Sequence, residues 1–465
     1  MFRKRKLLAA LAVATSVFAA CAKDDETTTT TVKPSETSEG STETTQPELT
    51  DSFRGVTAKS VKIGFAVIDY ECIAQFVDMN HGDQDAAIDA MVDYVNNNGG
   101  ILGRSIEPVK KVYCPIDATA PNGSQALCTS FTDDEEVFAV LGVFIDFGGE
   151  AQLCLSRDHE TVHIGHELEQ QWIDDALPGL MLTPDITAEK RTDVLLNLLE
   201  EEGTLEGMKV AVLTDQDTEA RASLAADKLE SMGLELGSTA VLTIVTSDTA
   251  QAQTQLDSFI ERWRGEDIGA LFVAGGRAGD DQFISKIKDA FPDLQLIFDM
   301  PSAAIGAGQD AKAQGLDPNP FQGMLSAEGL TASERWANKN ATLQQCVDIY
   351  EEATGETLKG PDEVDIVDDK RVEQYVAVTD FCGEVMMFKQ IAEKAGANLT
   401  NDTWVEAVNS FGAMELPSTD AASICADKYA ADDAFRVVRF DEDATEAGDW
   451  VPAGEIIDAS GGFCG

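Results

Sequence analysis

From Val61 onward, short apolar runs alternate with amphipathic stretches along most of the chain. The run Val61–Asp69 has the length and the β-branched content of a buried strand. Apolar residues in the next stretch fall at the spacing of one helical face: Ile88, Met91, Val92 and Val95. Because a single helix between two strands implies a right-handed parallel crossover, the alternation predicts α/β sheets.

Two such sets follow one another. The first has predicted strands at 61–69, 106–113, 137–144 and 161–165, with helices at 125–131 and 152–157. The second begins after 180–185 and has predicted strands at 208–215, 240–244, 268–276 and 294–300, separated by helices at 190–201, 219–232, 251–264 and 281–291. The remainder has strands at 323–328 and 435–440 and helices near 336–354 and 372–395. Each set has the size of a domain, whereas the remainder does not predict a third one.

The N-terminus has the layout of an export signal. Four basic residues, Arg3–Lys6, precede an apolar run, Leu7–Ala20, that is shorter than the roughly 20 residues of a membrane-spanning helix. The small residues before Cys21 resemble the lipobox of bacterial lipoproteins, in which the cysteine is acylated and becomes the mature N-terminus. Phe18 stands where that pattern usually has leucine, and the alternative is simple secretion after cleavage at Ala20.

Composition separates a tether from the folded part. Residues 21–57 are rich in Thr, Glu, Ser and Pro, so we expect a flexible tether that cannot bury enough apolar surface to fold. The 465 residues include 83 acidic and 34 basic side chains, and the net charge of -49 disfavours nucleic acid and anionic lipid surfaces as partners. Because 43% of the residues are hydrophobic, we expect these acids to cover folded domains.

The cysteines agree with export. Of nine, assigning Cys21 to lipid leaves eight, an even number that an oxidising compartment would pair. The sequence has no C-x-x-C and no Cys–His spacing of a zinc site, so no metal and no cofactor is predicted. The motifs G-x-S-x-G, G-x-x-x-x-G-K, H-E-x-x-H and G-x-G-x-x-G after a strand are also absent, and we expect the protein not to be an enzyme.

Several strings, in their order and spacing, resemble the type 1 periplasmic solute-binding proteins of the branched-chain amino-acid-binding kind. They are KIGFAVID from Lys62, VNNNGGILGRSIEPV from Val95, ITAEKRTDVLLNLLEEEGTLEGMKVAVLTDQD from Ile186 and RFDEDATEAGDWVP from Arg439. The resemblance runs from about Val61 to Asp458. It implies an α/β fold of two doubly wound parallel-sheet lobes joined by a three-strand hinge, with the ligand held between them.

The same resemblance divides the chain into a signal at 1–20, the tether, and two lobes. Lobe 1 is expected to comprise 58–184 and about 325–410, and lobe 2 to comprise 185–324 and about 411–465. In the implied lobe topology, with strand order 2-1-3-4, four disulfides are expected: Cys72–Cys114, Cys128–Cys154, Cys346–Cys382 and Cys425–Cys464.

Ligand-binding candidates are the residues just past each predicted strand. In lobe 1 they are Asp69, Tyr70, Asp146, Phe147, Gly148, Gly149, His166 and Glu167. Gly148 and Gly149 begin a helix, where free N–H groups would hold an anion, and the alternative is a tight turn. Phe144, Phe147 and Trp172 would form an apolar wall or belong to the core. The family's amino-acid binders usually have Ser or Thr at these turns, whereas this chain has FIDFGGE and HIGHELE.

In lobe 2 the same rule selects Asp215, Asp217, Arg277 and Asp299. Arg277 would grip a ligand carboxylate, or else pair with Asp280 or Asp281 at the surface. Asp146 and Asp299 are candidates for a ligand ammonium.

Three histidines lie close together in sequence, with acids between and after them: His159, His163 and His166, and Glu160, Glu167 and Glu169. They suggest a metal site as an alternative, but a strand and a helix end would point these side chains apart.

The resemblance implies a lipid-tethered extracytoplasmic protein that captures an amino acid, amide or similar solute. It would deliver the solute to the permease and ATPase of an ABC importer, and its only membrane contact would be the lipid on Cys21. The alternatives are a ligand-sensing receptor module that signals to a membrane partner and a metal-scavenging lipoprotein.

Overall fold

The computed structural model describes most of the chain after residue 47. The described residues are 48–74, 79–116, 123–146, 148–245, 249–275, 277–317, 319–367, 370–458 and 464. The predicted signal peptide, Cys21 and most of the predicted tether therefore lie outside the described residues. Within the described ranges, no helix is both long and apolar enough to cross a bilayer.

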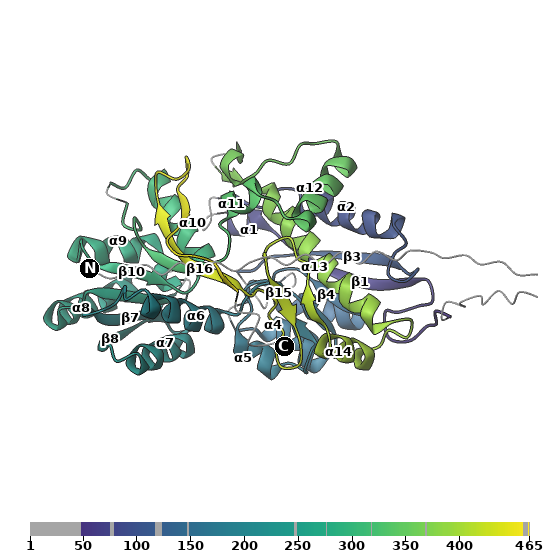
Figure 1. The fold of residues 1–465 in the computed structure, drawn as a ribbon, viewed down its shortest axis with the longest axis horizontal. Coiled ribbons are helices and arrows are strands. Elements are labelled where there is room, and N and C mark those ends of the chain that lie inside the picture. Colours follow the sequence, from purple (N-terminus) through teal and green to yellow (C-terminus); the bar gives the residue numbers. More distant parts are fainter. Residues whose placement is uncertain are drawn as a thin grey trace, which may run out of the picture. The chain divides into compact units, whose positions relative to one another are not determined.

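Lobe 1 is built on a five-stranded parallel sheet (Figure 1). Its strands, in spatial order, are β3 (Ser105–Tyr113), β1 (Ser60–Ile68), β4 (Ala139–Leu141), β5 (Val162–Ile164) and β6 (Met181–Leu182). The first four strands stand in the predicted 2-1-3-4 order. The strand order reverses between β1 and β4, which is where open α/β sheets bind ligands.

Helices cover both faces of this sheet. Those of the first half are α1 (Tyr70–Ile73), α2 (Gln84–Asn97), α3 (Ser124–Thr129), α4 (Glu150–Leu153) and α5 (Gln170–Asp175), with π-helical turns η1 (Ser130–Asp134) and η2 (Cys154–Asp158). Those of the later segment are α11 (Ala332–Ala337), α12 (Ala341–Thr354), the turn η4 (Pro361–Glu363), α13 (Gln374–Ala395) and α14 (Asn401–Asn409). Small sheets complete the lobe: β2 (Met79–Asn80) with β12 (Asp365–Val367) and β13 (Lys370–Val372), and β14 (Gly412–Met414) with β15 (Ala422–Ile424).

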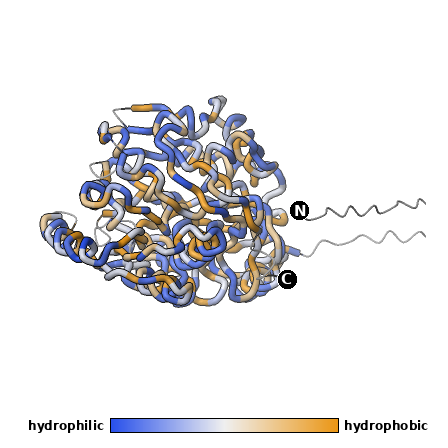
Figure 2. Tube along the Cα trace, turned by 60° about the vertical axis from the view of Figure 1, so that its left-hand side comes forward, coloured by the Kyte–Doolittle hydropathy of each residue, from blue (hydrophilic) through white to orange (hydrophobic). Residues whose placement is uncertain are grey.

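Alternating side chains of β1 supply two cores. Ile63 and Phe65 pack with residues of α2, α12 and α13, whereas Ala66 and Ile68 pack with residues of α3 and α4. This period of two follows from the pleat of a strand. Figure 2 shows short hydrophobic and hydrophilic segments alternating along the trace. The sheet is buried on both faces, as a doubly wound sheet must be.

Lobe 2 has a longer, mixed sheet. Its strands in order are β17 (Asp449–Pro452), β16 (Ala434–Asp441), β11 (Leu325–Glu328), β10 (Gln295–Phe298), β9 (Ala270–Ala274), β7 (Lys209–Asp215) and β8 (Glu235–Leu242), and β18 (Ile457–Asp458) pairs with β16. Its helices are α6 (Ala188–Glu201), α7 (Glu219–Ser231), α8 (Ala250–Glu266), the turn η3 (Arg277–Gly279), α9 (Asp281–Ala290) and α10 (Pro301–Ala313). Val210 and Val212 pack with residues of α6 and α7, and Ala211 and Leu213 pack with residues of α8, α9 and α10.

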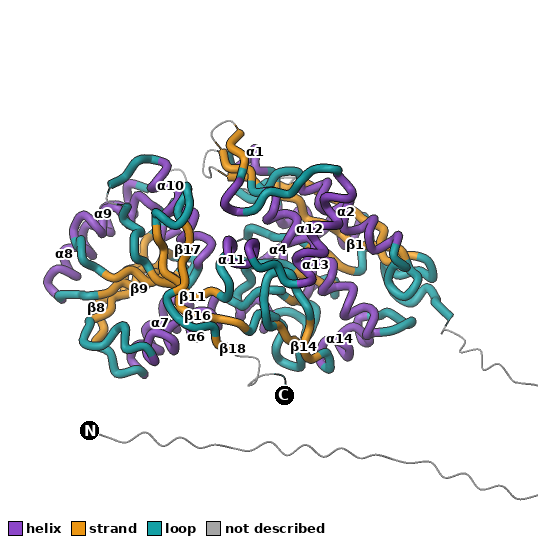
Figure 3. Tube along the Cα trace, turned by 45° about the horizontal axis from the view of Figure 1, so that its top comes forward, coloured by secondary structure: helices purple, strands orange, loops and turns teal. Residues whose placement is uncertain are grey.

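The chain passes between the two lobes three times: after β6, after β11 and before β16. Two crossovers are bonded to each other, because Thr183 donates to the carbonyl of Tyr429 at 3.0 Å and Ala431 donates to the carbonyl of Thr183 at 2.9 Å. The third follows β11, which pairs antiparallel with β16 (Figure 3). The expected three-strand connection is therefore present.

The division between the lobes differs from the expected one at two places. β11 was expected in lobe 1 but is hydrogen-bonded between β10 and β16 of the lobe 2 sheet. Conversely, β14 and β15 were expected in lobe 2, but Met414 and Ile424 are buried in the lobe 1 core with Trp404. In both cases the lobe of a short segment is decided by where it is buried and which strand it pairs with. The order of elements along the chain does not show to which lobe such a segment belongs.

The folded part also begins earlier than expected. Val56, which the sequence assigned to the tether, is 2% exposed in the lobe 1 core, and the ring of Phe53 lies 6.0 Å from that of Phe138. Arg104 fixes this segment by donating to the carbonyls of Thr50 at 3.1 Å and Thr57 at 2.7 Å. Residues 48–57 are thus part of lobe 1.

Most predicted elements are present, but two have other bounds and two helices were missed. The strand predicted at 240–244 starts earlier, and the helix predicted at 336–354 is two helices, because Asn340 caps a new start at α12. Helix α10 was missed because its glycines are unfavourable in helices, yet Gly308 is needed where the ring of Phe440 packs on it. The short helix α14 was also missed.

All four expected disulfides are present in the structure. Cys72–Cys114 joins the ends of β1 and β3, and Cys128–Cys154 joins the α3 and α4 segments. Two further bonds involve the later part of the chain: Cys346–Cys382, between α12 and α13, and Cys425–Cys464, near the C-terminus.

Candidate functional site

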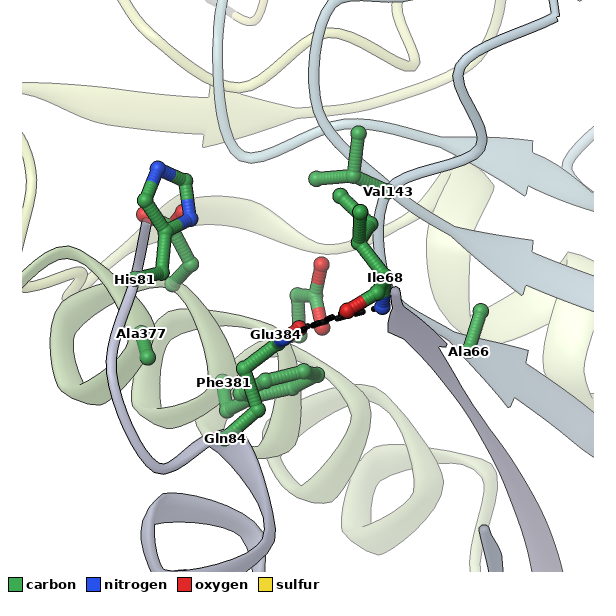
Figure 4. Close-up of a pocket in the computed structure, with 9 residues that line it drawn as sticks. Ala66, Ile68, His81, Gln84, Val143, Ala377, Phe381 and Glu384 are labelled. Carbon is green, nitrogen blue, oxygen red and sulfur yellow. Dashed lines mark hydrogen bonds between the residues drawn. The ribbon is translucent and has the colours of Figure 1, made fainter. Parts of the chain in front are cut away.

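A small pocket lies at the carboxyl ends of β1 and β4, beside α13 (Figure 4). It is lined by Ala66, Ile68, His81, Gln84, Val143, Ala377, Asp380, Phe381 and Glu384. Its room of about 20 Å³ is enough for one water-sized group. Gln84, at the start of α2, holds the wall in place by exchanging two hydrogen bonds with the backbone of Ile68, at 2.9 and 3.2 Å.

Glu384 is the most unusual residue in this pocket. Its side chain is fully buried on α13, and neither of its oxygens has a hydrogen-bond partner among the described residues. Burial raises the pKa of this carboxyl well above its ordinary value. In Figure 4 the carboxylate lies between His81 and the side chains of Ile68 and Val143. It is therefore available to a bound group.

His166 links the pocket to the first crossover. Its Nδ1 lies 2.8 Å from Oδ2 of Asp185, and its Nε2 lies 3.5 Å from Oε1 of Glu384 and 4.0 Å from Oδ1 of Asp380. Burial opposes the charged imidazole, but the three carboxyls outweigh it and raise the pKa of His166 well above its ordinary value. His166 is thus a buried cation whose shortest bond is to Asp185.

Three other groups complete the lobe 1 side. The rings of Tyr70 and His81 lie 5.0 Å apart. Burial, with the charge of His166, lowers the pKa of His81 to about 4, so this imidazole is neutral at pH 7. Burial raises the pKa of Asp380 to about 6, although the charge of His166 opposes this. The site therefore combines the cation of His166 with carboxyls whose pKa values are raised.

Lobe 2 presents a buried arginine at the end of its sheet. Arg221, on α7, is 3% exposed, and its Nη1 lies 3.4 Å from Oδ2 of Asp299. Asp299 is itself fully buried and accepts a hydrogen bond from the N–H of Gly275 at 3.0 Å. The Nε of Arg221 has no hydrogen-bond partner among the described residues. Asp299 therefore orients Arg221 and is not placed to take a ligand ammonium, contrary to the sequence prediction.

The remaining lobe 2 candidates form one loop cluster. Asp215 is buried and accepts from the N–H of Asp217 at 2.9 Å and from the hydroxyl of Thr218 at 3.2 Å. Burial raises the pKa of Asp217, and the charge of Arg277 opposes that shift. Arg277 also lies near Asp280, whose pKa burial raises to about 7. Asp217 and Arg277 are thus brought together, while Asp215 holds the loop.

The two lobes contact each other directly. The hydroxyl of Ser302, on α10, donates to Oε1 of Glu167 at 2.7 Å. The Nε of Arg221 lies 3.8 Å from Oε1 of Glu169, which precedes α5. Burial raises the pKa of Glu169 to about 7, even though Arg221 lowers it. Carboxylates of lobe 1 therefore face cationic and hydroxyl groups of lobe 2.

Four of the predicted lobe 1 residues have local structural roles in this structure. Asp69 caps α1 by accepting from the N–H groups of Glu71 and Cys72. Asp146 accepts from the N–H of Gly148 at 3.4 Å and of Ala151 at 2.8 Å, and its carbonyl accepts from the N–H of Gly149 at 3.0 Å. The expected anion site is thus taken by the chain's own carboxylate.

Gly149 and the aromatic residues belong to the packing of this turn. Gly149 has a φ of +69°, and a Cβ on it would lie 2.6 Å from the ring of Trp172. Phe144 is 5% exposed and packs between Tyr113 and His163, so it is core. Phe147 lies outside the described residues. Trp172 supports the turn and does not form a ligand wall with Phe144.

The three neighbouring histidines do not converge. His159 lies 3.4 Å from Asp133, and His163 is fully buried with its Nδ1 3.2 Å from the carbonyl of Val140. Among the described residues, the one tight group of candidate metal ligands is Cys128, Cys154 and His159. Because Cys128 and Cys154 are bonded to each other, their sulfurs are not thiolate ligands.

Five residues of the site were missed by the sequence reasoning: His81, Glu169, Arg221, Asp380 and Glu384. Asp380 and Glu384 are four apart in the otherwise apolar stretch VAVTDFCGEVMMF, and this spacing on a buried helix was the available signal. Arg221 comes from the first turn of a helix instead of the strand end. Of the predicted residues, Tyr70, His166 and Glu167 lie near this pocket. Burial raises the pKa of Tyr70, with the carboxyls of Asp380 and Glu167 adding to the rise, and His166 lies 3.5 Å from Glu384.

Comparisons with known proteins agree with this architecture. A family model described as periplasmic binding protein matches residues 79–446. A comparison with curated proteins finds no match. Among solved structures, a solute-binding protein of an ABC transporter from R. palustris, in complex with 4-hydroxybenzoate, has a TM-score of 0.61 at 12% identity, covering 86% of this chain and 98% of that one.

Two other solved structures are similar. A fatty acid ABC transporter substrate-binding protein from Thermomonospora curvata has a TM-score of 0.59 at 16% identity, covering 90% of this chain and 98% of that one. The branched-chain amino acid transporter substrate-binding protein LivJ from Streptococcus pneumoniae, in complex with isoleucine, has a TM-score of 0.55 at 13% identity, covering 86% and 100%. At these identities the structures show a shared fold, and the family model shows more: the chain belongs to the periplasmic binding protein family.

Proposed function

We propose that this protein is an extracytoplasmic solute-binding protein that captures a small ligand between its lobes and delivers it to an ABC importer. One observation carries the proposal. Two buried ionisable side chains, Glu384 of lobe 1 and Arg221 of lobe 2, each have polar atoms without a hydrogen-bond partner among the described residues. Buried groups of this kind are costly unless a ligand or water completes them.

The proposed mechanism is closure of the two lobes on the ligand. The three crossovers form the hinge, and groups from both lobes meet at Glu167–Ser302 and Glu169–Arg221. A ligand that contacts both lobes binds the closed arrangement more tightly than an open one, so it shifts the population toward closure. The closed shape is what a transporter would recognise.

Export and anchoring belong to the proposal as well. The signal at 1–20 would be removed, Cys21 would carry lipid, and the tether would let the lobes reach a permease. The solved relatives named above are ABC transporter proteins, which supports a permease and an ATPase as partners. Their named ligands are an aromatic acid, fatty acid and an amino acid, and we propose an amino acid, amide or similar solute here.

Ligand capture is testable on the purified mature protein. Native mass spectrometry identifies any ligand that co-purifies, and a thermal-shift screen covers amino acids, amides, amines and aromatic acids. We expect at least one solute to raise the melting temperature and to make the protein more compact in X-ray scattering. If no solute class does either, the binding function is wrong.

Anchoring has a separate test. In cells fed labelled palmitate, the wild-type protein should incorporate label, whereas Cys21→Ser should not and should be released into the medium. A variant at an internal cysteine pair, Cys425→Ala with Cys464→Ala, is the matched control and should keep its label. Equal labelling of Cys21→Ser and wild type would contradict lipidation at this position.

A further inference from the structure

The pocket beside α13 contains more hydrogen-bond acceptors than the surrounding chain satisfies. Glu384 contributes two buried oxygens, and Asp380, one helical turn earlier, lines the same pocket with a side chain that is 26% exposed. Among the residues that line the pocket, none is a lysine or arginine. A carboxylate in such a place calls for a partner that donates hydrogen bonds.

The nearby cation does not supply enough donors. The Nδ1 of His166 lies 2.8 Å from Asp185. Its Nε2, which has no hydrogen-bond partner among the described residues, lies 3.5 Å from Glu384 and 4.0 Å from Asp380. Three carboxyls therefore share one imidazolium. Arg335 adds a more distant positive influence on Asp380. The Nε2 of His166 therefore faces two carboxyls, Asp380 and Glu384, which together have more acceptor oxygens than this one N–H group can satisfy.

We infer that this pocket binds the primary ammonium group of a small amine, which makes the captured solute a cation or a zwitterion. The inference rests on the proposed function and names its ligand class. An ammonium has three donors and no acceptor, and the pocket offers three acceptors: Glu384, Asp380 and the neutral imidazole of His81. The half-buried His81 and partly exposed Asp380 lie at the open end, where the rest of the ligand extends.

Other ligand chemistries fit this pocket less well. Its room matches one water-sized group, which is also the size of an ammonium head. A carboxylate would be repelled by Asp380 and Glu384. A divalent metal needs a tighter set of ligands than the described residues provide here, because no such group includes Glu384 or His166.

The test compares three probes of the same shape and different charge. Propylammonium chloride, 1-propanol and sodium propionate are titrated by calorimetry into the mature wild-type protein at pH 7.5, with sodium chloride matched throughout. We expect binding of propylammonium alone.

Three variants on one helix assign the effect to the pocket. Glu384→Gln keeps the shape, removes the carboxylate and should weaken propylammonium binding by about 10- to 100-fold. Asp380→Asn should weaken it by a similar or smaller factor. Glu393→Gln, on the same helix but paired with Lys389, is the matched control and should bind as wild type does. Thermal unfolding checks that each variant is folded.

The outcomes separate this inference from the function it rests on. If propionate or propanol binds and propylammonium does not, the ammonium site is wrong while solute binding stands. If Glu384→Gln and Glu393→Gln bind propylammonium equally well, the site lies elsewhere. If neither these probes nor any solute of the wider screen binds, the proposed function itself fails. A co-purified ligand without a basic nitrogen would also overturn the inference.

Discussion

The Nδ1 of His166 lies 2.8 Å from Oδ2 of Asp185, so one ion pair joins the carboxyl end of β5 to the first crossover between the lobes. Removing one partner leaves the other charge poorly compensated in a mostly buried place. We predict that His166→Ala lowers the free energy of unfolding by about 3 kcal/mol at pH 6. Urea denaturation measures the change.

The pH dependence of that loss has a definite sign. The folded-state pKa of His166 lies above that of the unfolded chain, because its carboxyl partners outweigh burial. The stabilisation is therefore complete below about pH 6.5 and is lost as the pH rises through the folded pKa. His159→Ala, which removes an exposed pair with Asp133, should cost about 1 kcal/mol or less. A loss from His166→Ala that grows with pH would contradict the prediction.

Glu169 gives a second pH-dependent prediction, which concerns a buried acid instead of a base. Burial raises its pKa to about 7, with Arg221 opposing and Glu189, Asp299 and Asp215 adding to the rise. A carboxyl whose folded pKa is raised destabilises the protein as the pH rises from about 4.5 to about 7. Glu169→Gln should therefore be about 1–3 kcal/mol more stable than wild type at pH 8 and equal to it at pH 4.5.

Thermal unfolding at pH 4.5 and pH 8 measures this difference. Glu200→Gln is the control, since Glu200 is exposed on α6 and should change stability little at either pH. If Glu169→Gln is less stable than wild type at pH 8, then attraction to Arg221 outweighs the cost of burying the charge, and the 3.8 Å contact is a stabilising interlobe bond.

More of the fold than of the candidate site could be predicted from the sequence. Short apolar runs and single intervening helices were enough to predict the parallel strands of both sheets, because burial on two faces leaves continuous apolar runs such as Val61–Ile68. His166 and Tyr70, which were selected because they follow predicted strands, lie beside the pocket residues Glu384 and His81, and their contact with a ligand stays a prediction. Asp380 and Glu384 were missed because a helix from a distant part of the chain supplies them, and only packing brings α13 to β1 and β4.

The same limit explains the errors in lobe 2. Asp299 follows a strand, as a ligand-binding residue would, but it is fully buried and bonded to Gly275 and Arg221. The sequence pattern does not distinguish an acid that contacts the ligand from an acid that orients a neighbouring ligand-binding residue. Arg221 was not predicted as a site residue because it lies on a helix, α7, and arginines on helices are usually exposed to solvent.

The disulfide between Cys346 and Cys382 gives a stability prediction. It joins α12 to α13, and both residues are fully buried. With a sequence separation of 36, the chain-entropy relation gives a stabilisation of about 4 kcal/mol. Replacing both residues by alanine should lower the unfolding free energy by that amount, measured in urea without reductant. Peptide mapping of the wild type should recover this pair, and a loss below about 1 kcal/mol would contradict the prediction.

Two adjacent glycines before α4 make a matched pair of substitutions. At Gly149 the backbone has a φ of +69°, and an added Cβ would lie 2.6 Å from the Trp172 ring, so both the backbone and the packing oppose a side chain. At Gly148 the nearest heavy atom to an added Cβ lies 3.8 Å away. Gly149→Ala should therefore lose more than about 1 kcal/mol of unfolding free energy, while Gly148→Ala should be neutral or slightly stabilising. Because both glycine N–H groups bond to Asp146, equal effects of the two substitutions on thermal unfolding would mean that the turn, and not the contact with Trp172, sets the requirement for glycine.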